Sequence, residues 1–252
     1  MAFELYAACG CNVGNLRMTN EDNFFFHGQC LEEVNRGLAA PLTMNCPLDT
    51  PVCVAVFDGM GGEECGEVAS HAAAEKLKSI SAKEAGVRPG EEALEALSAD
   101  LNLAVVQQKR ALHTEKMGTT QVLLCFDRKQ VYACNLGDSR AYRLRDGELE
   151  QLSRDHVSQL VMPGQLKAPL NQYLGIDPGE LRLVPTIVKG KLKLGDTYLL
   201  CSDGLTDMVS EEEIRDILQA NPVTRSCVTA LIDAALKNGG MDNVTVIVCS
   251  IL

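Results

Sequence analysis

Acidic residues stand at the ends of several predicted β-strands that lie far apart in the sequence. They are Glu21, Asp22, Asp58, Asp138, Asp203 and Asp242. A single acid at a strand end is usually a turn residue. Neighbouring strands are only ~4.8 Å apart, however, so acids at adjacent strand ends can come within a few ångströms of one another. Without a partner these carboxylates would repel each other strongly in a partly desolvated cleft, so we expect a positive partner.

A divalent metal ion is the simplest partner for such a cluster, because few lysines or arginines stand beside these acids. The four histidines show no metal-ligand spacing, and ligation by oxygen alone favours Mg²⁺ or Mn²⁺ over zinc or copper. Calcium is an alternative, although the sequence contains no EF-hand spacing. Arg17 precedes these acids and is suited to binding two phosphate oxygens beside the ions, unless it is simply a solvated surface arginine.

The composition is that of an ordinary globular protein, with 252 residues of which 46% are hydrophobic and 23% charged. The net charge of -11 argues against nucleic acid or an anionic membrane as a partner. We expect neither a signal peptide in residues 1–11 nor a membrane span, because no apolar run approaches ~20 residues. The eleven scattered cysteines are typical of a reducing cytoplasm, and we interpret Cys9 and Cys11 as buried apolar side chains rather than zinc ligands.

Hydrophobic periodicity predicts a chain that contains both strands and helices. The predicted strands are 3–9, 22–27, 52–57, 119–126, 130–135, 139–145, 182–188, 197–202 and 243–249. The predicted helices are 64–84, 91–113, 211–220 and 223–237. Ser210 is the predicted N-cap of the third helix. We interpret the turns at 126–131 and 135–140 as hairpin links between antiparallel strands.

Two stretches without steady periodicity, 28–50 and 153–180, predict loops. The second contains Pro163, Pro169 and Pro178 and is long enough to act as a lid or binding loop; a packed irregular connection is the alternative. No repeat and no linker-like composition divides the chain. We therefore expect one domain over residues 1–252, in which distant parts of the sequence share a sheet system covered by helices.

Seven sequence motifs follow one another along the chain. They are VGNLRMTNEDNFF, VAVFDGMGGEECGEVAS, GTTQVLLCF, NLGDSRAYRL, RDH, LLCSDGLTDMVSEEEI and DNVTVIV. In this order they resemble the metal-dependent protein phosphatase (PPM) family, the type 2C serine/threonine phosphatases, and most closely its compact bacterial members. The likeness spans essentially the whole chain. It implies an α/β (α+β) fold, namely a four-layer αββα sandwich of two mostly antiparallel β-sheets flanked by helices, with metal ions in a cleft at one end.

The resemblance implies that four residues hold two ions, Mn²⁺ or Mg²⁺. Asp58 would bridge both ions, and the backbone carbonyl of Gly59 would bind one of them. Asp203 and Asp242 would complete the other ion's ligands. The glycines after Asp58 would let the chain turn sharply and present a carbonyl to a cation. Such ions, about 3.5–4 Å apart, share a water, lower its pKa and direct hydroxide at phosphorus.

The resemblance also implies roles for residues around this pair of ions. Glu21 and Asp22 would act mainly through metal-bound waters, and Asp138 would help to hold a possible third, looser ion. Arg17 would bind the substrate phosphate. The residues implied to be catalytic are then Arg17, Asp58, Asp203 and Asp242.

The chain departs from the family pattern in two places. Met60 stands where eukaryotic relatives carry a histidine after Asp-Gly, and Glu63 stands where bacterial relatives often carry one. The identity of the general acid is therefore open. The region 156–174 corresponds to the family's mobile flap and is shorter than usual, which leaves substrate preference open.

We expect a cytoplasmic signalling enzyme that hydrolyses phosphoserine and phosphothreonine in proteins. Its partners would be phosphorylated proteins and a cognate serine/threonine kinase, and we expect a monomer that binds neither nucleic acid nor membrane. One alternative is a regulatory pseudophosphatase that recognises phosphoproteins with little or no turnover. Another is a two-metal hydrolase that acts on small phosphoesters.

Overall fold

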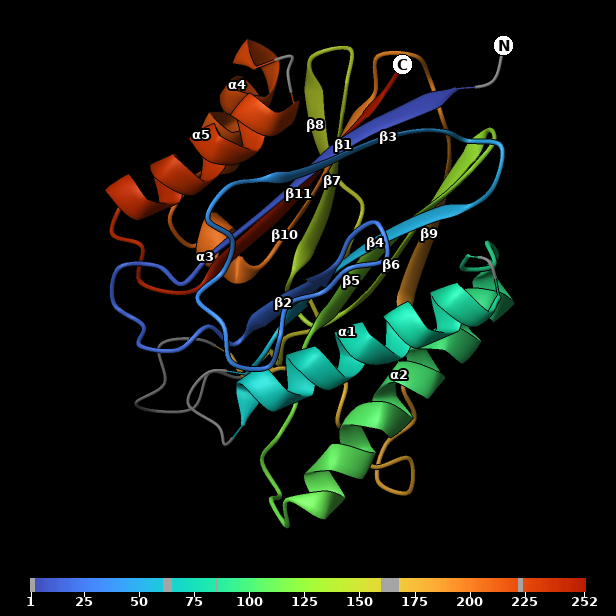
Figure 1. The fold of residues 1–252 in the computed structure, drawn as a ribbon, viewed down its shortest axis with the longest axis vertical. Coiled ribbons are helices and arrows are strands. Elements are labelled where there is room, and N and C mark those ends of the chain that lie inside the picture. Colours follow the sequence, from blue (N-terminus) through green and yellow to red (C-terminus); the bar gives the residue numbers. More distant parts are fainter. Residues whose placement is uncertain (1–2, 61–64, 85, 160–167, 222–223) are drawn as a thin grey trace.

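Two antiparallel β-sheets lie face to face in the computed structural model, which describes residues 3–60, 65–84, 86–159, 168–221 and 224–252 (Figure 1). The six-stranded sheet has the order β3-β1-β11-β10-β7-β8. Its strands are β1 (Glu4–Asn12), β3 (Leu42–Pro47), β7 (Arg140–Arg145), β8 (Glu148–Gln151), β10 (Thr197–Cys201) and β11 (Val244–Ile251). The five-stranded sheet has the order β2-β4-β5-β6-β9. Its strands are β2 (Asp22–Phe25), β4 (Val52–Asp58), β5 (Gln121–Asp127), β6 (Gln130–Leu136) and β9 (Thr186–Lys191).

Helices cover the outer face of each sheet (Figure 1). The helices α1 (Gly66–Lys83) and α2 (Glu91–Ala111) pack on the five-stranded sheet. The helices α3 (Asp203–Thr206), α4 (Glu211–Ala220) and α5 (Thr224–Lys237) pack on the six-stranded sheet. The predicted four-layer sandwich is confirmed. The predicted helix starts at 64 and 223 lie outside the described residues, and within those residues no helix is long and apolar enough to span a bilayer.

The side chains of β4 show why the strands of the five-stranded sheet are almost continuously apolar. Val54 and Val56 point into the core between the two sheets. Ala55 and Phe57 point to the other face, where they pack with Leu77 of α1. Both faces of the strand are therefore buried, so every position is apolar until the strand ends at Asp58.

The first and last strands of the chain pair with each other, as the sequence analysis expects of distant segments. Leu5 of β1 lies opposite Ile251 of β11, and the register continues to Asn12 opposite Val244. This pairing brings residues 12–22, which follow β1, next to residues 240–244, which precede β11. Glu21 and Asp22, which follow β1, and Asp242, which precedes β11, therefore lie at the same edge of the molecule.

Two strands were missed by the sequence analysis, and a third is displaced. β3 lies in the predicted loop 28–50; it is an edge strand whose six residues alternate between covered and exposed side chains, a pattern too short to stand out in a stretch rich in loop-forming residues. β8 follows the turn at Asp146 and Gly147, both of which have positive φ as a tight type I′ hairpin turn requires. β9 begins at Thr186 rather than at residue 182.

The prediction of a hairpin link at 135–140 is wrong. β6 belongs to the five-stranded sheet and β7 to the six-stranded sheet, so this segment crosses from one sheet to the other. Gly137 makes the crossing possible, because it has φ +99° and a Cβ there would lie 2.7 Å from the Thr120 side chain. The hydroxyl groups of Thr120 and Ser139 are hydrogen-bonded at 2.7 Å, which ties the segment to β5. We call residues 135–140 the crossover turn.

Candidate metal centre

A cleft of about 740 Å³ lies where the ends of β4 and β10 meet the crossover turn. Six of the eight residues to which the sequence analysis assigned a role line it. They are Arg17, Asp58, Gly59, Asp138, Asp203 and Asp242. The other two, Glu21 and Asp22, contact the lining residues without lining the cleft themselves. The cleft is also lined by Met60 and by Ala168, Pro169, Leu170 and Tyr173 from the predicted loop 153–180.

Asp58 occupies the last position of β4, and its backbone is fixed by the neighbouring strand. Its carbonyl oxygen accepts hydrogen bonds from the Thr120 N–H (2.8 Å) and the Thr119 hydroxyl (2.9 Å). Its own N–H donates to the Thr120 hydroxyl (3.0 Å). Burial raises the pKa of the Asp58 carboxyl well above its usual range, and the negative charges of nearby aspartates raise it further.

Gly59 has no room for a side chain. A Cβ at this position would lie 2.3 Å from the carbonyl oxygen of Gly66 and 2.7 Å from that of Glu21. The Gly59 N–H donates to the same Glu21 carbonyl at 3.0 Å. The glycine therefore allows β4, the segment before β2 and the start of α1 to meet closely, a constraint that the sequence analysis did not foresee.

Glu21 and Asp22 lie at the start of β2, beside the end of β4. The Asp22 carboxylate is buried, and its Oδ2 accepts hydrogen bonds from the hydroxyls of Ser202 (2.8 Å) and Thr245 (2.7 Å). Burial raises the pKa of Asp22 to about 7, with Asp203 and Asp242 adding to the rise and the two hydroxyls opposing it. The other oxygen, Oδ1, has no hydrogen-bond partner among the described residues.

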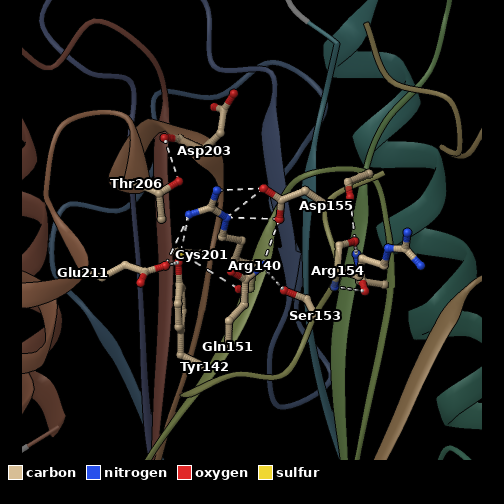
Figure 2. Close-up of polar contacts among 12 residues, drawn as sticks. Arg140, Tyr142, Gln151, Ser153, Arg154, Asp155, Cys201, Asp203, Thr206 and Glu211 are labelled. Carbon is tan, nitrogen blue, oxygen red and sulfur yellow. Dashed lines mark hydrogen bonds and ion pairs between the residues drawn. The ribbon is translucent and has the colours of Figure 1, made fainter. Parts of the chain in front are cut away.

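Asp203 begins the short helix α3 directly after β10. Its backbone carbonyl accepts hydrogen bonds from the Asp207 N–H (2.8 Å) and the Thr206 hydroxyl (3.4 Å), the second of which is drawn in Figure 2. Gly204 has to be a glycine, because a Cβ there would lie 1.9 Å from the Asn243 carbonyl oxygen. This close packing brings Asp203 to the segment that carries Asp242.

Arg17 and Asp242 form an ion pair in the wall of the cleft. Arg17 Nη2 donates to Asp242 Oδ2 at 2.7 Å, and both side chains are about one-third exposed. Burial alone would lower the pKa of Arg17, but its hydrogen bond to Asp242 and the negative charges of Asp242, Glu21 and Asp58 together outweigh burial and raise the pKa. The sequence analysis gave these two residues separate roles, and the structure brings them into direct contact.

Asn243 organises this part of the cleft and received no role in the sequence analysis. Its side-chain amide donates to the carbonyl oxygens of Val13 (2.9 Å) and Thr19 (3.0 Å), and its Oδ1 accepts from the Glu21 N–H (2.8 Å). One side chain thus holds both ends of the loop that carries Arg17. The motif DNVTVIV contains this asparagine, but an asparagine before a strand is indistinguishable by sequence from an ordinary turn residue.

The chemistry of the cleft fits divalent cations. Five aspartates line it, namely the four already named and Asp207, and Arg17 is the one lysine or arginine among the described residues that do so. Asp22 presents a buried, unpartnered oxygen beside them. Within the described ranges, however, no three His, Cys, Asp or Glu side chains converge closely enough to enclose an ion. The aspartates therefore supply the right donors for Mg²⁺ or Mn²⁺ and would have to draw together around the ions.

Two features of the predicted site fall partly outside the described residues. Glu63 lies outside them, as do residues 160–167 of the predicted loop 153–180. The two described parts of that loop are joined, because the Ser158 N–H donates to the Pro169 carbonyl at 2.8 Å and the Asn171 N–H donates to the His156 carbonyl at 2.9 Å. The loop therefore returns to the cleft as a narrow, hydrogen-bonded pair of segments.

Comparison with known families matches residues 46–238 to the family described as Protein phosphatase 2C. The chain belongs to the protein phosphatase 2C family. The resemblance on which the sequence analysis relied is therefore confirmed. The matched range contains Asp58, Asp138 and Asp203, whereas Arg17 and Asp242 lie outside it.

Individual members of the protein phosphatase 2C family are similar over most of this chain. The serine/threonine protein phosphatase PstP of Mycobacterium tuberculosis is 37% identical over 79% of the chain, which spans only 40% of PstP. The serine/threonine phosphatase stp of Listeria welshimeri is 34% identical over 79% of the chain and 84% of its own length. A crystal structure of the PstP catalytic domain with two manganese ions is 31% identical, with a TM-score of 0.76 and 99% of each chain covered.

Proposed function

We propose that the chain is a metal-dependent serine/threonine protein phosphatase. The observation that carries the proposal is the cleft at the end of the two sheets, where five aspartates and one arginine from distant segments line a common space. The family and the names of its relatives support the reaction class. The alternative of a pseudophosphatase gains no support, because each acid implied by the resemblance is present at its position.

The proposed ligands of two Mn²⁺ or Mg²⁺ ions are the carboxylates of Asp58, Asp203 and Asp242 and the carbonyl of Gly59. When bound, a pair of such ions lowers the pKa of a water and neutralises charge on the phosphoryl group. The PstP catalytic domain, whose structure contains two manganese ions, supports this number of ions. Glu21 and Asp22 would support the centre from behind Asp58, and Asp138 would contribute to a third ion.

The proposed role of Arg17 is to orient the phosphate of the substrate. Its guanidinium presents paired N–H donors that match two phosphate oxygens. In the structure one of its nitrogens, Nη2, donates to Asp242. Opening this ion pair would free Nη2 for a phosphate oxygen, so metal binding by Asp242 and phosphate binding by Arg17 should favour each other.

The surface around Arg17 favours a protein substrate over a small molecule. Leu16 and Met18 flank the arginine with 64% and 81% of their surfaces exposed, and Met241 beside Asp242 is 58% exposed. Apolar side chains at the rim of a charged cleft are suited to contact the residues around a phosphoserine or phosphothreonine. We further propose a cytoplasmic, monomeric, single-domain enzyme that opposes a serine/threonine kinase.

The most direct test is hydrolysis of a phosphothreonine peptide and of an aryl phosphate with Mn²⁺, with Mg²⁺ or with a chelator. The proposal requires turnover of the peptide that depends on the metal ion. Turnover that survives complete chelation would contradict the metal centre. Tight Mn²⁺ binding without turnover would favour the pseudophosphatase, and a strong preference for metabolite phosphoesters would favour the small-molecule hydrolase.

A further inference from the structure

Residues 154–156, the RDH motif, run alongside the crossover turn, and each of them is bound by a different residue of that turn. We call Arg154, Asp155 and His156 the clamp segment. The sequence analysis used this motif only to recognise the family and assigned it no function. The backbone of Arg154 is held by Asn135, whose side chain accepts from the Arg154 N–H (3.1 Å) and donates to the Arg154 carbonyl (2.7 Å).

Asp155 forms the central contact of the clamp segment, a two-point ion pair with Arg140. Arg140 Nε donates to Asp155 Oδ1 at 3.1 Å, and Nη2 donates to Oδ2 at 2.7 Å (Figure 2). Gln151 Nε2 also donates to Asp155 Oδ1 at 2.9 Å. On its far side the Arg140 guanidinium donates to the Tyr142 hydroxyl (3.0 Å), which in turn donates to Glu211 of α4 (3.1 Å). Arg140 is therefore held from both sides.

His156 closes the clamp segment onto the residue directly before Asp138. The His156 N–H donates to the Gly137 carbonyl at 3.0 Å, and the Gly137 N–H donates back to His156 Nδ1 at 3.2 Å. Nδ1 must accept in this contact, so Nε2 carries the proton and donates to the Thr186 hydroxyl at 3.0 Å. Both ring nitrogens are thereby used, and the imidazole has one orientation.

The contacts of the clamp segment surround Asp138. Asn135 and Gly137 precede this aspartate and Arg140 follows it, and all three bind the clamp segment. On the opposite side, the Ser139 hydroxyl bonds to Thr120, which also holds the backbone of Asp58. The crossover turn is thus hydrogen-bonded to Thr120, directly before β5, on one side and to the clamp segment on the other. Of its residues, Asp138 alone lines the cleft.

We propose that the clamp segment positions Asp138 for cation binding and that Asp155, acting through Arg140, is its decisive positioning residue. The inference rests on the proposed function, because it assigns a device to the same metal centre. The clamp segment also lies at the start of the loop 153–180, whose later residues Ala168, Pro169, Leu170 and Tyr173 line the cleft.

The structure supplies a matched control for Asp155. Arg145, at the other end of β7, forms a similar two-point pair with Asp196, with Nε–Oδ1 and Nη2–Oδ2 distances of 2.6 Å. Neither residue of this pair lines the cleft. Asp155→Asn and Asp196→Asn therefore each remove one negative charge from a two-point pair with an arginine of β7. The first pair lies beside the crossover turn, and the second lies away from the cleft.

The test is Mn²⁺ binding to the metal-free protein by titration calorimetry, with Asp138→Asn first identifying the binding step that depends on Asp138. We expect Asp155→Asn to weaken that step about tenfold, the lower end of the effect of outer ligand contacts. We expect Asp196→Asn to leave it within twofold while lowering the melting temperature at least as much. In the Asp138→Asn background, Asp155→Asn should cause no further loss, because it acts through Asp138.

Three outcomes would overturn the inference. The first is an Asp138→Asn protein in which every Mn²⁺ binding step is unchanged. The second is a folded Asp155→Asn protein with normal Mn²⁺ binding. The third is an equal loss of Mn²⁺ affinity when Asp155→Asn is made in the wild type and in the Asp138→Asn protein. If Asp155→Asn fails to fold, Arg140→Lys takes its place, since lysine keeps the charge but not the two-point contact, and should weaken the step severalfold. A wild-type protein that shows this coupling but hydrolyses no phosphopeptide would preserve the clamp and contradict only the proposed function.

Discussion

The two ends of β10 carry acids with opposite surroundings. Asp196 stands directly before the strand and is buried, yet its pKa is lowered. Burial by itself would raise that pKa, but Arg145, the Lys193 N–H and the Tyr198 hydroxyl all donate to the carboxylate and outweigh burial. At the other end of the strand, Asp203 faces Asp22 and Asp58, whose pKa values are raised by burial and by neighbouring aspartates.

The difference distinguishes Asp196, which stabilises the fold, from the aspartates of the cleft, which are suited to bind a ligand. At the Asp196 end the chain supplies its own cation and enough donors, so the ionised carboxylate is stable where it lies. At the Asp203 end five aspartates line the cleft, and Arg17 is the one lysine or arginine among the described residues that lines it, so negative charge is in excess. A strand end with such an excess of carboxylates is suited to an external cation.

The largest expected effect follows from removing charge at the cleft end. Asp58→Asn or Asp203→Asn should lower kcat for a phosphothreonine peptide by at least about 100-fold, because each change removes a proposed metal ligand. The same Asp58→Asn change should raise the melting temperature of the chelated protein by about 2–4 °C, because it relieves repulsion among the aspartates. Differential scanning calorimetry and steady-state kinetics check the two effects.

The pairing of these two results sharpens the comparison. If Asp58 mainly stabilised the fold, as Asp196 does, its replacement would lower both the activity and the stability of the protein. An Asp58→Asn protein that is inactive and also less stable in chelator would therefore show that Asp58 stabilises the fold. The proposed difference between the acids at the two ends of β10 would then be wrong.

Arg17→Ala should have the next largest effect. We expect KM for the phosphopeptide to rise about tenfold, because a two-point contact to phosphate is lost, with a smaller change in kcat. The variant also frees Asp242 from its ion pair, so Mn²⁺ should bind more tightly in calorimetry. Unchanged KM and kcat would remove Arg17 from the site, and unchanged Mn²⁺ affinity would show that the ion pair does not compete with the metal.

Asp196→Asn tests the other end of the strand. Its loss leaves the partly buried Arg145 guanidinium without its counter-charge and weakens the hydrogen bonds to the carboxylate, so we expect the free energy of unfolding to fall by about 2 kcal/mol in urea titrations at neutral pH. The pKa of Asp196 is lowered in the folded protein, so its contribution is present above the unfolded value of ~4 and is lost as the pH falls below it. The difference between the variant and the wild type should therefore shrink in acid. Activity per folded molecule should stay within twofold.

The sequence predicted the layers of the fold because the decisive strands and helices are long and strongly patterned. Strands buried on both faces, such as β4, are continuous apolar runs, and α4 begins at Ser210, whose hydroxyl accepts from the Glu213 N–H at 3.2 Å as an N-cap should. The failures have different causes. The edge strand β3 alternates covered and exposed residues, but only over six positions inside a loop-like stretch. The crossover turn depends on which sheet receives β7, and local residue patterns do not encode this choice.

For the site, the sequence identified the acids but not how they are held. Asp58, Asp203 and Asp242 carry a visible signal, since each stands where an apolar strand begins or ends. Asn243 and Arg140 carry none, because their contacts run to Thr19 and Asp155 over long or irregular stretches of chain. The ion pair between Arg17 and Asp242 could not be predicted either, because it depends on the pairing of β1 with β11.

The smallest expected effect concerns Cys201, which lies in β10 between the two ends compared above. Burial raises the pKa of its thiol to about 12, and its side chain packs in the core under α3 and α5. Cys201→Ala should cost about 1 kcal/mol of stability through lost packing. It should leave kcat within twofold, because the proposed reaction uses no protein nucleophile. A large loss of activity in a folded Cys201→Ala protein would mean that the chemistry of this strand is not confined to the aspartates at its cleft end.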